Sequence, residues 1–192
     1  MWIIRKGDKL FHKHYELNKD SIFFDVGGHL GGFTDKILAI YNCKSYIFEP
    51  HPEQYIQLAK KYSNDDRVQV FDYGLGGVNK DVYLTDEEGS SEVTQNETNI
   101  KIKIKDIVSV MNQLNIENID FLKLNIEGSE YELLESLISS NNLDKIKYLQ
   151  IQFHENVNNA VIKRNEIIKE MRKTHFNKWT YYFVWERWDR KE

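Results

Sequence analysis

The sequence predicts one α/β domain built on a doubly wound, mostly parallel sheet. Short apolar runs alternate with longer amphipathic runs, which is typical of βαβ units packed around such a sheet. The chain has 192 residues, of which 41% are hydrophobic and 29% charged, as in a water-soluble globular protein with one core. We therefore expect a single domain over residues 1–192, with residues 1–20 as a lead-in and residues 74–105 as an insertion.

The first part of the chain predicts three strands and two helices in alternation. The expected strands are Ser21–Asp25, Ser45–Glu49 and Arg67–Asp72, and the expected helices are Phe33–Tyr41 and Glu53–Tyr62. The first strand is apolar through three consecutive residues, as expected of a strand that is covered on both faces.

The insertion has a different character. Residues 74–99 are rich in glycine, serine, threonine and acidic residues around the apolar piece Val82–Leu84, which predicts a loop or an irregular hairpin. Isoleucine and lysine then alternate strictly over Ile100–Lys105. This period of two predicts an edge strand whose lysines face water.

The rest of the chain returns to alternating helices and strands. The expected helices are Ile107–Asn115, Ser129–Ser139 and Val161–Thr174, and the expected strands are Phe121–Ile126, Tyr148–His154 and the aromatic segment Trp179–Trp185.

Composition and charge argue against several classes of function. With 26 Lys and Arg against 30 Asp and Glu, the formal charge is −4, so we expect no nucleic-acid partner. The single cysteine, Cys43, cannot form an internal disulfide, and no metal-ligand spacing is present, so we expect no metal and a cytoplasmic location. Residues 1–19 mix charged and apolar side chains, so we expect neither a signal peptide nor a membrane span.

A glycine-rich loop follows the first strand and is the clearest sign of a ligand site. Its form, D-x-G-x-x-x-G over Asp25–Gly31, places backbone N–H groups at the carboxyl edge of the sheet, where doubly wound folds bind nucleotides. The dinucleotide fingerprint needs glycine where Val26 stands, and a carboxylate at the strand end opposes a pyrophosphate. Asp25 therefore favours a ligand without phosphates that carries an amino group or a positive centre. The alternative is a purely structural turn.

Two further acids end the next two strands. Glu49 stands 24 residues after Asp25, close to the spacing of about 20 residues for an acid that accepts hydrogen bonds from ribose hydroxyls. Asp72 is either an acceptor for an adenine amino group or a solvated acid at a strand end. The pattern of strand-end acids indicates an adenosine site.

Polar side chains share one face of two later strands. They are Lys123, Asn125 and Glu127 in the first, and Gln150, Gln152 and His154 in the second. If these strands are neighbours, their carboxyl ends bring Asn125, Glu127 and His154 together beside the glycine loop. Polar groups inside a sheet need partners or a purpose, so this is either a catalytic cluster or a network that anchors loops.

Four motifs in this order make the chain resemble the FkbM family of S-adenosylmethionine-dependent methyltransferases. They are D-V-G-G-H-L-G at Asp25–Gly31, F-E-P-H-P at Phe48–Pro52, L-K-L-N-I-E-G-S-E at Leu122–Glu130, and the strand that ends in His154. The resemblance runs from about Ile22 to His154 and implies a Rossmann-like methyltransferase fold.

The resemblance also implies roles for individual residues. Those implied to bind S-adenosylmethionine are Asp25, Gly27, Gly28, His29, Gly31, Glu49, Asp72 and Ser91. Those implied to lie at the reaction site are Lys123, Asn125 and Glu127, with Glu130 as a residue that begins a helix. Because residues 86–99 have few apolar anchors, we expect them to form a mobile lid over the methyl acceptor.

Three positions depart from the family pattern. His29 stands where members usually have asparagine, Asn125 where they have aspartate, and Gln152 where they often have glutamate. An amide cannot take a proton from a substrate. We therefore predict His154 as the general base, with Glu127 either orienting it or binding the methyl acceptor, and with His29 as the reserve.

The resemblance implies O-methylation of a hydroxyl on a sugar, a polyketide or a lipid-linked glycan. Two other interpretations stay open. One is a nicotinamide-dependent dehydrogenase, which Val26 opposes. The other is a cofactor-binding scaffold that has lost catalysis, which the two replacements of acid by amide support.

Overall fold

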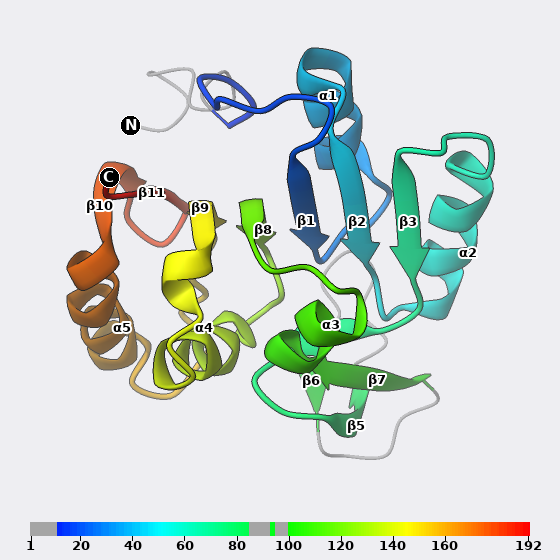
Figure 1. Ribbon diagram of the computed structural model, residues 1–192. Coiled ribbons are helices and arrows are strands. Elements are labelled where there is room, and N and C mark those ends of the chain that lie inside the picture. Colours follow the sequence, from blue (N-terminus) through cyan, green and yellow to red (C-terminus); the bar gives the residue numbers. More distant parts are fainter. Residues whose placement is uncertain (1–10, 85–92, 95–99) are drawn as a thin grey trace.

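The structure is a computed structural model that describes residues 11–84, 93–94 and 100–192. Its centre is a seven-stranded sheet in the order β10-β11-β9-β8-β1-β2-β3 (Figure 1). The strands are β1 (Ile22–Val26), β2 (Lys44–Phe48), β3 (Val68–Phe71), β8 (Ile119–Leu124), β9 (Ile146–Ile151), β10 (His175–Tyr181) and β11 (Trp185–Arg190). The neighbours from β3 to β9 are parallel, and β11 is antiparallel to both of its neighbours. The predicted doubly wound, mostly parallel α/β fold is confirmed.

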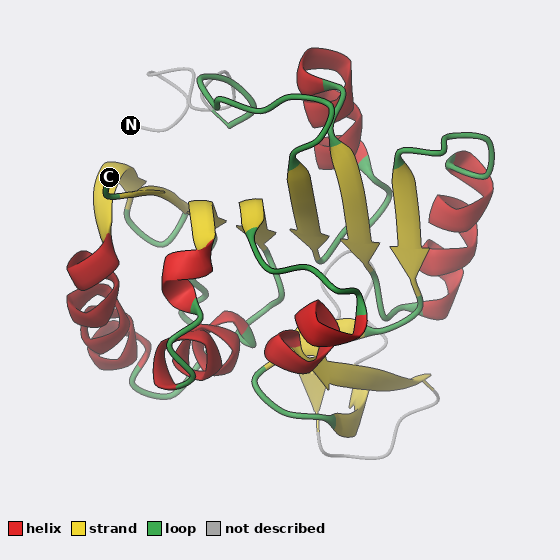
Figure 2. Ribbon diagram, in the orientation of Figure 1, coloured by secondary structure: helices red, strands yellow, loops and turns green. Residues whose placement is uncertain are grey.

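Helices connect the strands and cover both faces of the sheet (Figure 2). They are α1 (Gly32–Tyr41), α2 (Pro52–Lys61), α3 (Ile107–Gln113), α4 (Glu130–Ser139) and α5 (Ala160–Thr174), with a short 3₁₀ turn at Leu143–Lys145. Within the described ranges, no helix combines the length and the apolar character needed to cross a membrane.

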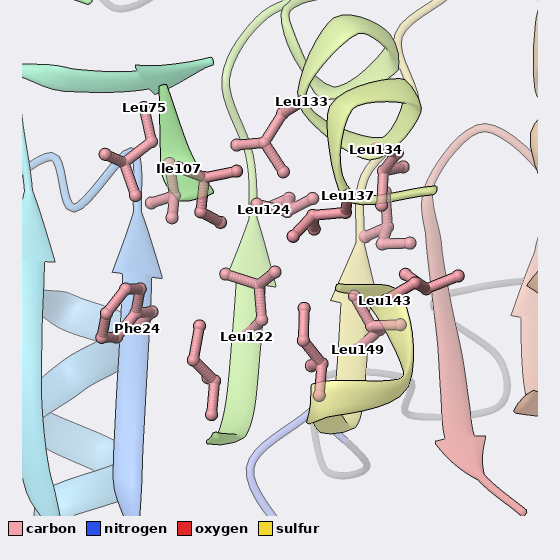
Figure 3. Close-up of a cluster of buried hydrophobic side chains, with 14 of the residues drawn as sticks. Phe24, Leu75, Ile107, Leu122, Leu124, Leu133, Leu134, Leu137, Leu143 and Leu149 are labelled. Atoms are coloured by element: carbon pink, nitrogen blue, oxygen red, sulfur yellow. The ribbon is translucent and has the colours of Figure 1, made fainter. Parts of the chain in front are cut away.

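The two faces of the sheet carry separate hydrophobic clusters because successive side chains of a strand point in opposite directions. Phe24, Leu122 and Leu149 pack with residues of α3 and α4 such as Ile107 and Leu134 (Figure 3). On the opposite face the clusters belong to α1, α2 and the N-terminal segment; they include Tyr15, Phe23, Phe121, Tyr148, Ile37, Ile47 and Leu58. The central strands are therefore buried on both faces, as the apolar run of β1 predicted for that strand.

The C-terminal aromatic segment forms a hairpin instead of the single strand expected over Trp179–Trp185. Strand β10 ends at Tyr181 and β11 begins at Trp185, with Val184 N–H donating to the carbonyl of Tyr181 across the turn. The turn contains no glycine or proline, and Phe183 adopts a positive φ of 49°. A turn of this composition lacks the residues that normally mark one in a sequence.

The insertion forms a second sheet of four strands in the order β4-β7-β5-β6. The strands are β4 (Gly74–Gly76), β5 (Lys80–Leu84), β6 (Val93–Thr94) and β7 (Ile100–Asp106). The expected alternation is present, since Ile102 and Ile104 are buried while Lys101 and Lys103 are exposed. The expected edge position is wrong, because β7 pairs with β4 on one side and β5 on the other. Most of the predicted lid, including Ser91, lies outside the described residues.

Candidate active site

A cavity of about 410 Å³ lies at the carboxyl edge of the main sheet. Its lining comes from the glycine loop and α1 (Gly27, Gly28, His29, Gly32, Phe33), from the end of β2 and α2 (Glu49, Pro50, His51, Gln54), from the second sheet (Gly74, Leu75, Leu84, Ile102, Ile104), from β8 and the turn into α4 (Lys123, Asn125, Ile126, Glu127, Ser129), and from Trp185 of β11. Pockets of this size typically hold small-molecule ligands and cofactors. The sheet topology brings together residues more than 150 positions apart.

The glycine loop passes so close to β8 that a side chain would not fit. Gly27 has a φ of +79°, and a Cβ atom built on it would lie 2.0 Å from the backbone oxygen of Asn125. Its N–H donates to the carbonyl of Phe48 at 3.0 Å. The loop is therefore held between β8 and β2, with its backbone at the cavity wall.

Glu49 lies at the end of β2 as the sequence predicted and lines the cavity. Its Oε2 accepts the N–H of His29 at 2.7 Å, and its Oε1 accepts the N–H of His51 at 2.9 Å. Burial raises the pKa of Glu49, and these two N–H groups partly oppose the rise. Each carboxylate oxygen has two acceptor positions, so one on each oxygen stays available to a ligand.

Asp25 lies beneath the loop and outside the cavity lining. Its side chain is fully buried, where Thr34 donates to Oδ2 at 2.7 Å and the Lys123 ammonium forms an ion pair with Oδ1 at 2.8 Å. Lys123 also donates to the carbonyl of Gly27 at 2.6 Å. The Asp25–Lys123 pair thus ties β1, β8 and the loop together, and direct contact of Asp25 with the ligand stays a prediction.

Asn125 and Glu127 follow β8 and line the cavity side by side with the loop. The Oδ1 atom of Asn125 is buried and has no hydrogen-bond partner among the described residues. Glu127 adopts a positive φ of 48°, a conformation that is uncommon for a residue with a side chain and clusters at functional sites. Its side chain is 34% exposed. Both residues therefore offer polar atoms to a ligand.

His154 lies behind Glu127, outside the cavity lining. Its Nε2 is 3.4 Å from Glu127 Oε2, and its Nδ1 is 3.2 Å from Oε1 of the fully buried Glu130. Burial lowers the pKa of His154, but the two carboxylates outweigh it and raise the pKa to about 9. His154 also holds the pKa of Glu127 below its usual range. At neutral pH the pair is therefore an imidazolium and a carboxylate, and the imidazolium has no free lone pair to accept a proton.

The remaining predicted residues are distributed as follows. His29 and Gly28 line the cavity, whereas Gly31 packs against Tyr62 beside it. Asp72 is exposed and lies outside the lining. Among the described residues, no group of three or more His, Cys, Asp or Glu is placed to hold a metal ion.

Sequence reasoning missed most of the cavity's apolar and aromatic lining. His51 stands inside the F-E-P-H-P motif, which could have indicated it. Phe33, Leu75 and Trp185 carry no such signal, because their side chains resemble ordinary core residues in the sequence.

Comparison with known proteins identifies the domain. The family model described as the methyltransferase FkbM domain matches residues 25–183, so the family expected from the four motifs is confirmed. No curated protein matches the chain by sequence.

Solved structures share the fold at low sequence identity. A proposed rRNA methylase of Clostridium thermocellum has a TM-score of 0.61 at 10% identity, covering 99% of this chain and 96% of that one. An rRNA methylase of Streptococcus thermophilus has a TM-score of 0.58 at 13% identity, with 100% and 98% covered. M. capricolum TrmK, in complex with S-adenosylhomocysteine, has a TM-score of 0.55 at 12% identity, with 100% and 69% covered.

Proposed function

The chain belongs to the FkbM family of S-adenosylmethionine-dependent methyltransferases, and from this premise we propose that it methylates a hydroxyl group of a small sugar-like acceptor. The observation that carries the proposal is the ionised Glu127, which faces the same cavity as the glycine loop and Glu49. The cavity thus combines a place for the cofactor with a group that takes a proton from a hydroxyl.

The residues around Glu49 fit S-adenosylmethionine. The free acceptor position on each oxygen of Glu49 matches the two donors of a ribose diol. Lys123 is the only lysine or arginine of the described lining, and its ammonium is already bound by Asp25 and the carbonyl of Gly27. The described lining therefore supplies no unengaged lysine or arginine for a pyrophosphate, which argues against a nicotinamide dinucleotide. When bound, S-adenosylmethionine supplies a sulfonium methyl group for in-line transfer.

Glu127 takes over the role that the sequence suggested for His154. A carboxylate with a lowered pKa is a weak base, but a hydroxyl becomes strongly acidic as its oxygen gains the methyl group. Glu127 then accepts the proton through its exposed carboxylate, while His154 holds that carboxylate in place from behind. Asn125 lies next to it, and its Oδ1 accepts a hydrogen bond from the acceptor.

Replacement of Glu127 tests this mechanism. We expect Glu127→Gln to lower kcat by about 10²- to 10⁴-fold, the usual cost of a lost general base, with little change in affinity for S-adenosylhomocysteine. The measurement is transfer of a labelled methyl group to a glycan extract, together with calorimetry. Glu135→Gln, on the exposed face of α4, is the matched control and should behave as the parent. Parental turnover in Glu127→Gln would refute the assignment.

A catalytically lapsed cofactor-binding protein is the second candidate, because Asn125 stands where the family has aspartate. In that case the parent binds S-adenosylhomocysteine and transfers no methyl group, and Asn125→Asp creates transfer. The same assay separates the two functions, since an active parent excludes the second.

A further inference from the structure

The order of the strands divides the cavity into two sides around the glycine loop. Glu49 comes from β2, on one side of β1, while Asn125, Glu127 and Trp185 come from β8 and β11 on the other. If Glu49 binds the ribose, as expected, the adenosyl part of the cofactor occupies the β2 side. The methyl acceptor then occupies the β8 and β11 side, against Trp185.

Two aromatic rings form the wall on the acceptor side. Phe33 and Trp185 both line the cavity, with ring centroids 6.4 Å apart and planes 27° from parallel. The N-terminal segment supports them, since Phe11 packs edge-on against Trp185 at 5.1 Å and His12 packs against Phe33 at 4.5 Å. Phe33 and Trp185 are together called the aromatic wall below.

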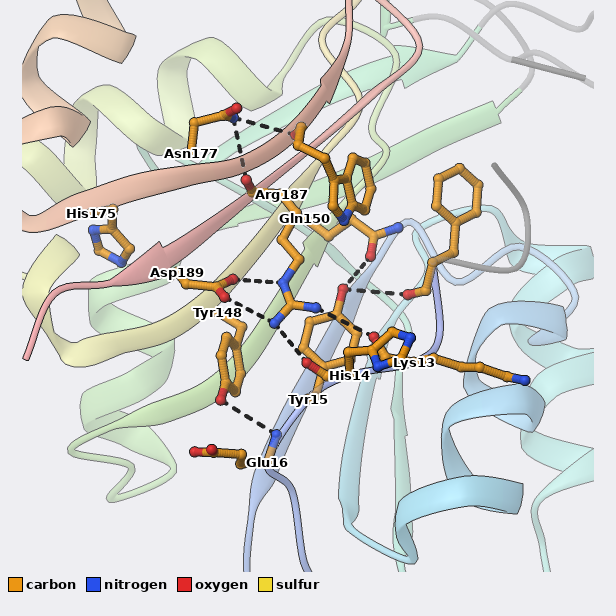
Figure 4. Close-up of polar contacts among 12 residues, drawn as sticks. Lys13, His14, Tyr15, Glu16, Tyr148, Gln150, His175, Asn177, Arg187 and Asp189 are labelled. Carbon is orange, nitrogen blue, oxygen red and sulfur yellow. Dashed lines mark hydrogen bonds and ion pairs between the residues drawn. The ribbon is translucent and has the colours of Figure 1, made fainter. Parts of the chain in front are cut away.

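The N-terminal segment is itself anchored by a buried arginine (Figure 4). Arg187 of β11 donates to the carbonyl of His14 at 2.8 Å, pairs with Asp189 at 2.6 Å, and lies 4.0 Å from the centre of the Tyr15 ring. Tyr15 in turn donates to Gln150 of β9 at 2.6 Å. These contacts fix the N-terminal segment against the sheet, and that segment supports the aromatic wall. The wall is therefore preformed in the absence of an acceptor.

The polar groups on this side indicate a neutral, hydroxyl-rich acceptor. Glu127 and the unpartnered Oδ1 of Asn125 are hydrogen-bond acceptors, and they suit hydroxyl donors. The carboxylate of Glu127 repels phosphate, and the only lysine of the described lining is already bound. An aromatic face beside such groups suits a ring with C–H bonds on one face and hydroxyls at its rim, because the face of an aromatic ring attracts positively polarised hydrogens.

We propose that Trp185, together with Phe33, is the platform on which a neutral pyranose ring of the acceptor packs, with its hydroxyl directed to Glu127. The proposal rests on the proposed function and makes it more specific, because it names the acceptor ring and the residue that selects it. A nucleobase of RNA stacked on the same wall is the competing occupant.

Saturation-transfer NMR on the protein saturated with S-adenosylhomocysteine tests the platform. The probes are methyl glycosides of glucose, galactose, mannose, fucose and rhamnose, with adenosine and uridine for comparison. We expect signal on the ring C–H protons of at least one glycoside and none on the nucleosides. Trp185→Leu should weaken that glycoside's binding by about 10-fold while S-adenosylhomocysteine affinity stays at the parental value.

Two variants serve as controls. Trp179→Leu changes a tryptophan that also contacts Phe11 but does not line the cavity, and it should bind the glycoside as the parent does. Trp185→Phe keeps an aromatic face and should retain most of the binding, which separates stacking from loss of folding.

Three results would overturn the platform: no glycoside of the panel binds, only the nucleosides bind, or Trp185→Leu binds the glycoside as tightly as Trp179→Leu. The proposed function would survive these results if a labelled methyl group still reached another hydroxyl in a Glu127-dependent reaction. Conversely, glycoside binding that depends on Trp185, with no methyl transfer to any hydroxyl, would refute the proposed function and leave the platform in place.

Discussion

Two pairs of opposite charge lie at the carboxyl edge of the sheet, and they differ in their exposure to the cavity. Asp25 and Lys123 are 2.8 Å apart, and their side chains are 0% and 5% exposed. Glu127 and His154 are 3.4 Å apart, with 34% and 12% exposed. In the first pair, the two charges are paired with each other, and Lys123 also binds the backbone of the glycine loop. The second leaves a carboxylate facing the cavity, so a ligand can reach it.

The two charge pairs beside this active site therefore have different functions. The buried Asp25–Lys123 pair stabilises the fold, because breaking it would leave an uncompensated charge in the interior. The partly exposed Glu127–His154 pair can take part in catalysis, because His154 sets the ionisation and orientation of Glu127 while solvent or substrate still reaches that carboxylate. Three changes test this division.

Loss of Lys123 should have the largest effect on stability. We expect Lys123→Met to lower the free energy of unfolding by about 3–5 kcal/mol, because Asp25 then lies buried without its partner. Urea denaturation at pH 7 measures the change. The double variant Asp25→Asn, Lys123→Met removes both charges and should recover much of the loss. A single variant as stable as the parent would show that the pair is not the framework of the loop.

Loss of His154 should have a smaller effect that depends on pH. The pKa of His154 is raised from about 6.5 to about 9, so its contribution to stability is complete below pH 6.5 and is lost as pH rises through 9. We expect His154→Gln to be less stable than the parent at pH 6, and the difference to shrink by about 3 kcal/mol by pH 9.5. Urea denaturation at both pH values measures it. A difference that does not change with pH would contradict the charged pair.

The smallest effect is the contribution of Glu127, relative to that of Glu130, to the raised pKa of His154. Glu127→Gln removes one of the two carboxylates, and Glu130 keeps the other at 3.2 Å. We expect the pKa of His154 to fall by about one unit, which corresponds to about 1.4 kcal/mol of interaction. NMR titration of the imidazole measures the pKa, with Glu135→Gln as the exposed control. An unchanged pKa would mean that Glu130 alone holds the proton.

Much of the framework could be predicted because it depends on local pattern. The apolar run of Ser21–Asp25 predicted a strand buried on both faces, and the alternation of Ile100–Lys105 predicted the two faces of that segment. The glycine loop followed from its place between a strand and a helix. The expected placement of Glu49 at the end of β2 followed in the same way. Each of these features depends on only a few neighbouring residues, so it can be predicted directly from the sequence.

The tertiary structure decided which residues meet. The alternating lysines of Ile100–Lys105 predicted an edge strand with one face in water. The structure pairs this strand with both β4 and β5, because its position depends on how the insertion folds. The turn at Phe183 carries no local signal, and it is this turn that brings Trp185 to the cavity.

The ionisation state of His154 could not be predicted from the sequence, because it depends on residues that are distant in the chain. Its local surroundings are ordinary, and the ordinary pKa made it the natural base. The raised pKa comes from Glu127 and Glu130, which stand more than 20 positions earlier and approach only because β8 and β9 are parallel neighbours. Period and turn composition are local properties, so the sequence determined the central strands and the glycine loop, and its four motifs indicated the family. Burial and charge pairing depend on distances across the fold. Only the tertiary structure therefore decided that Asp25 is buried in an ion pair and that Glu127 faces the cavity.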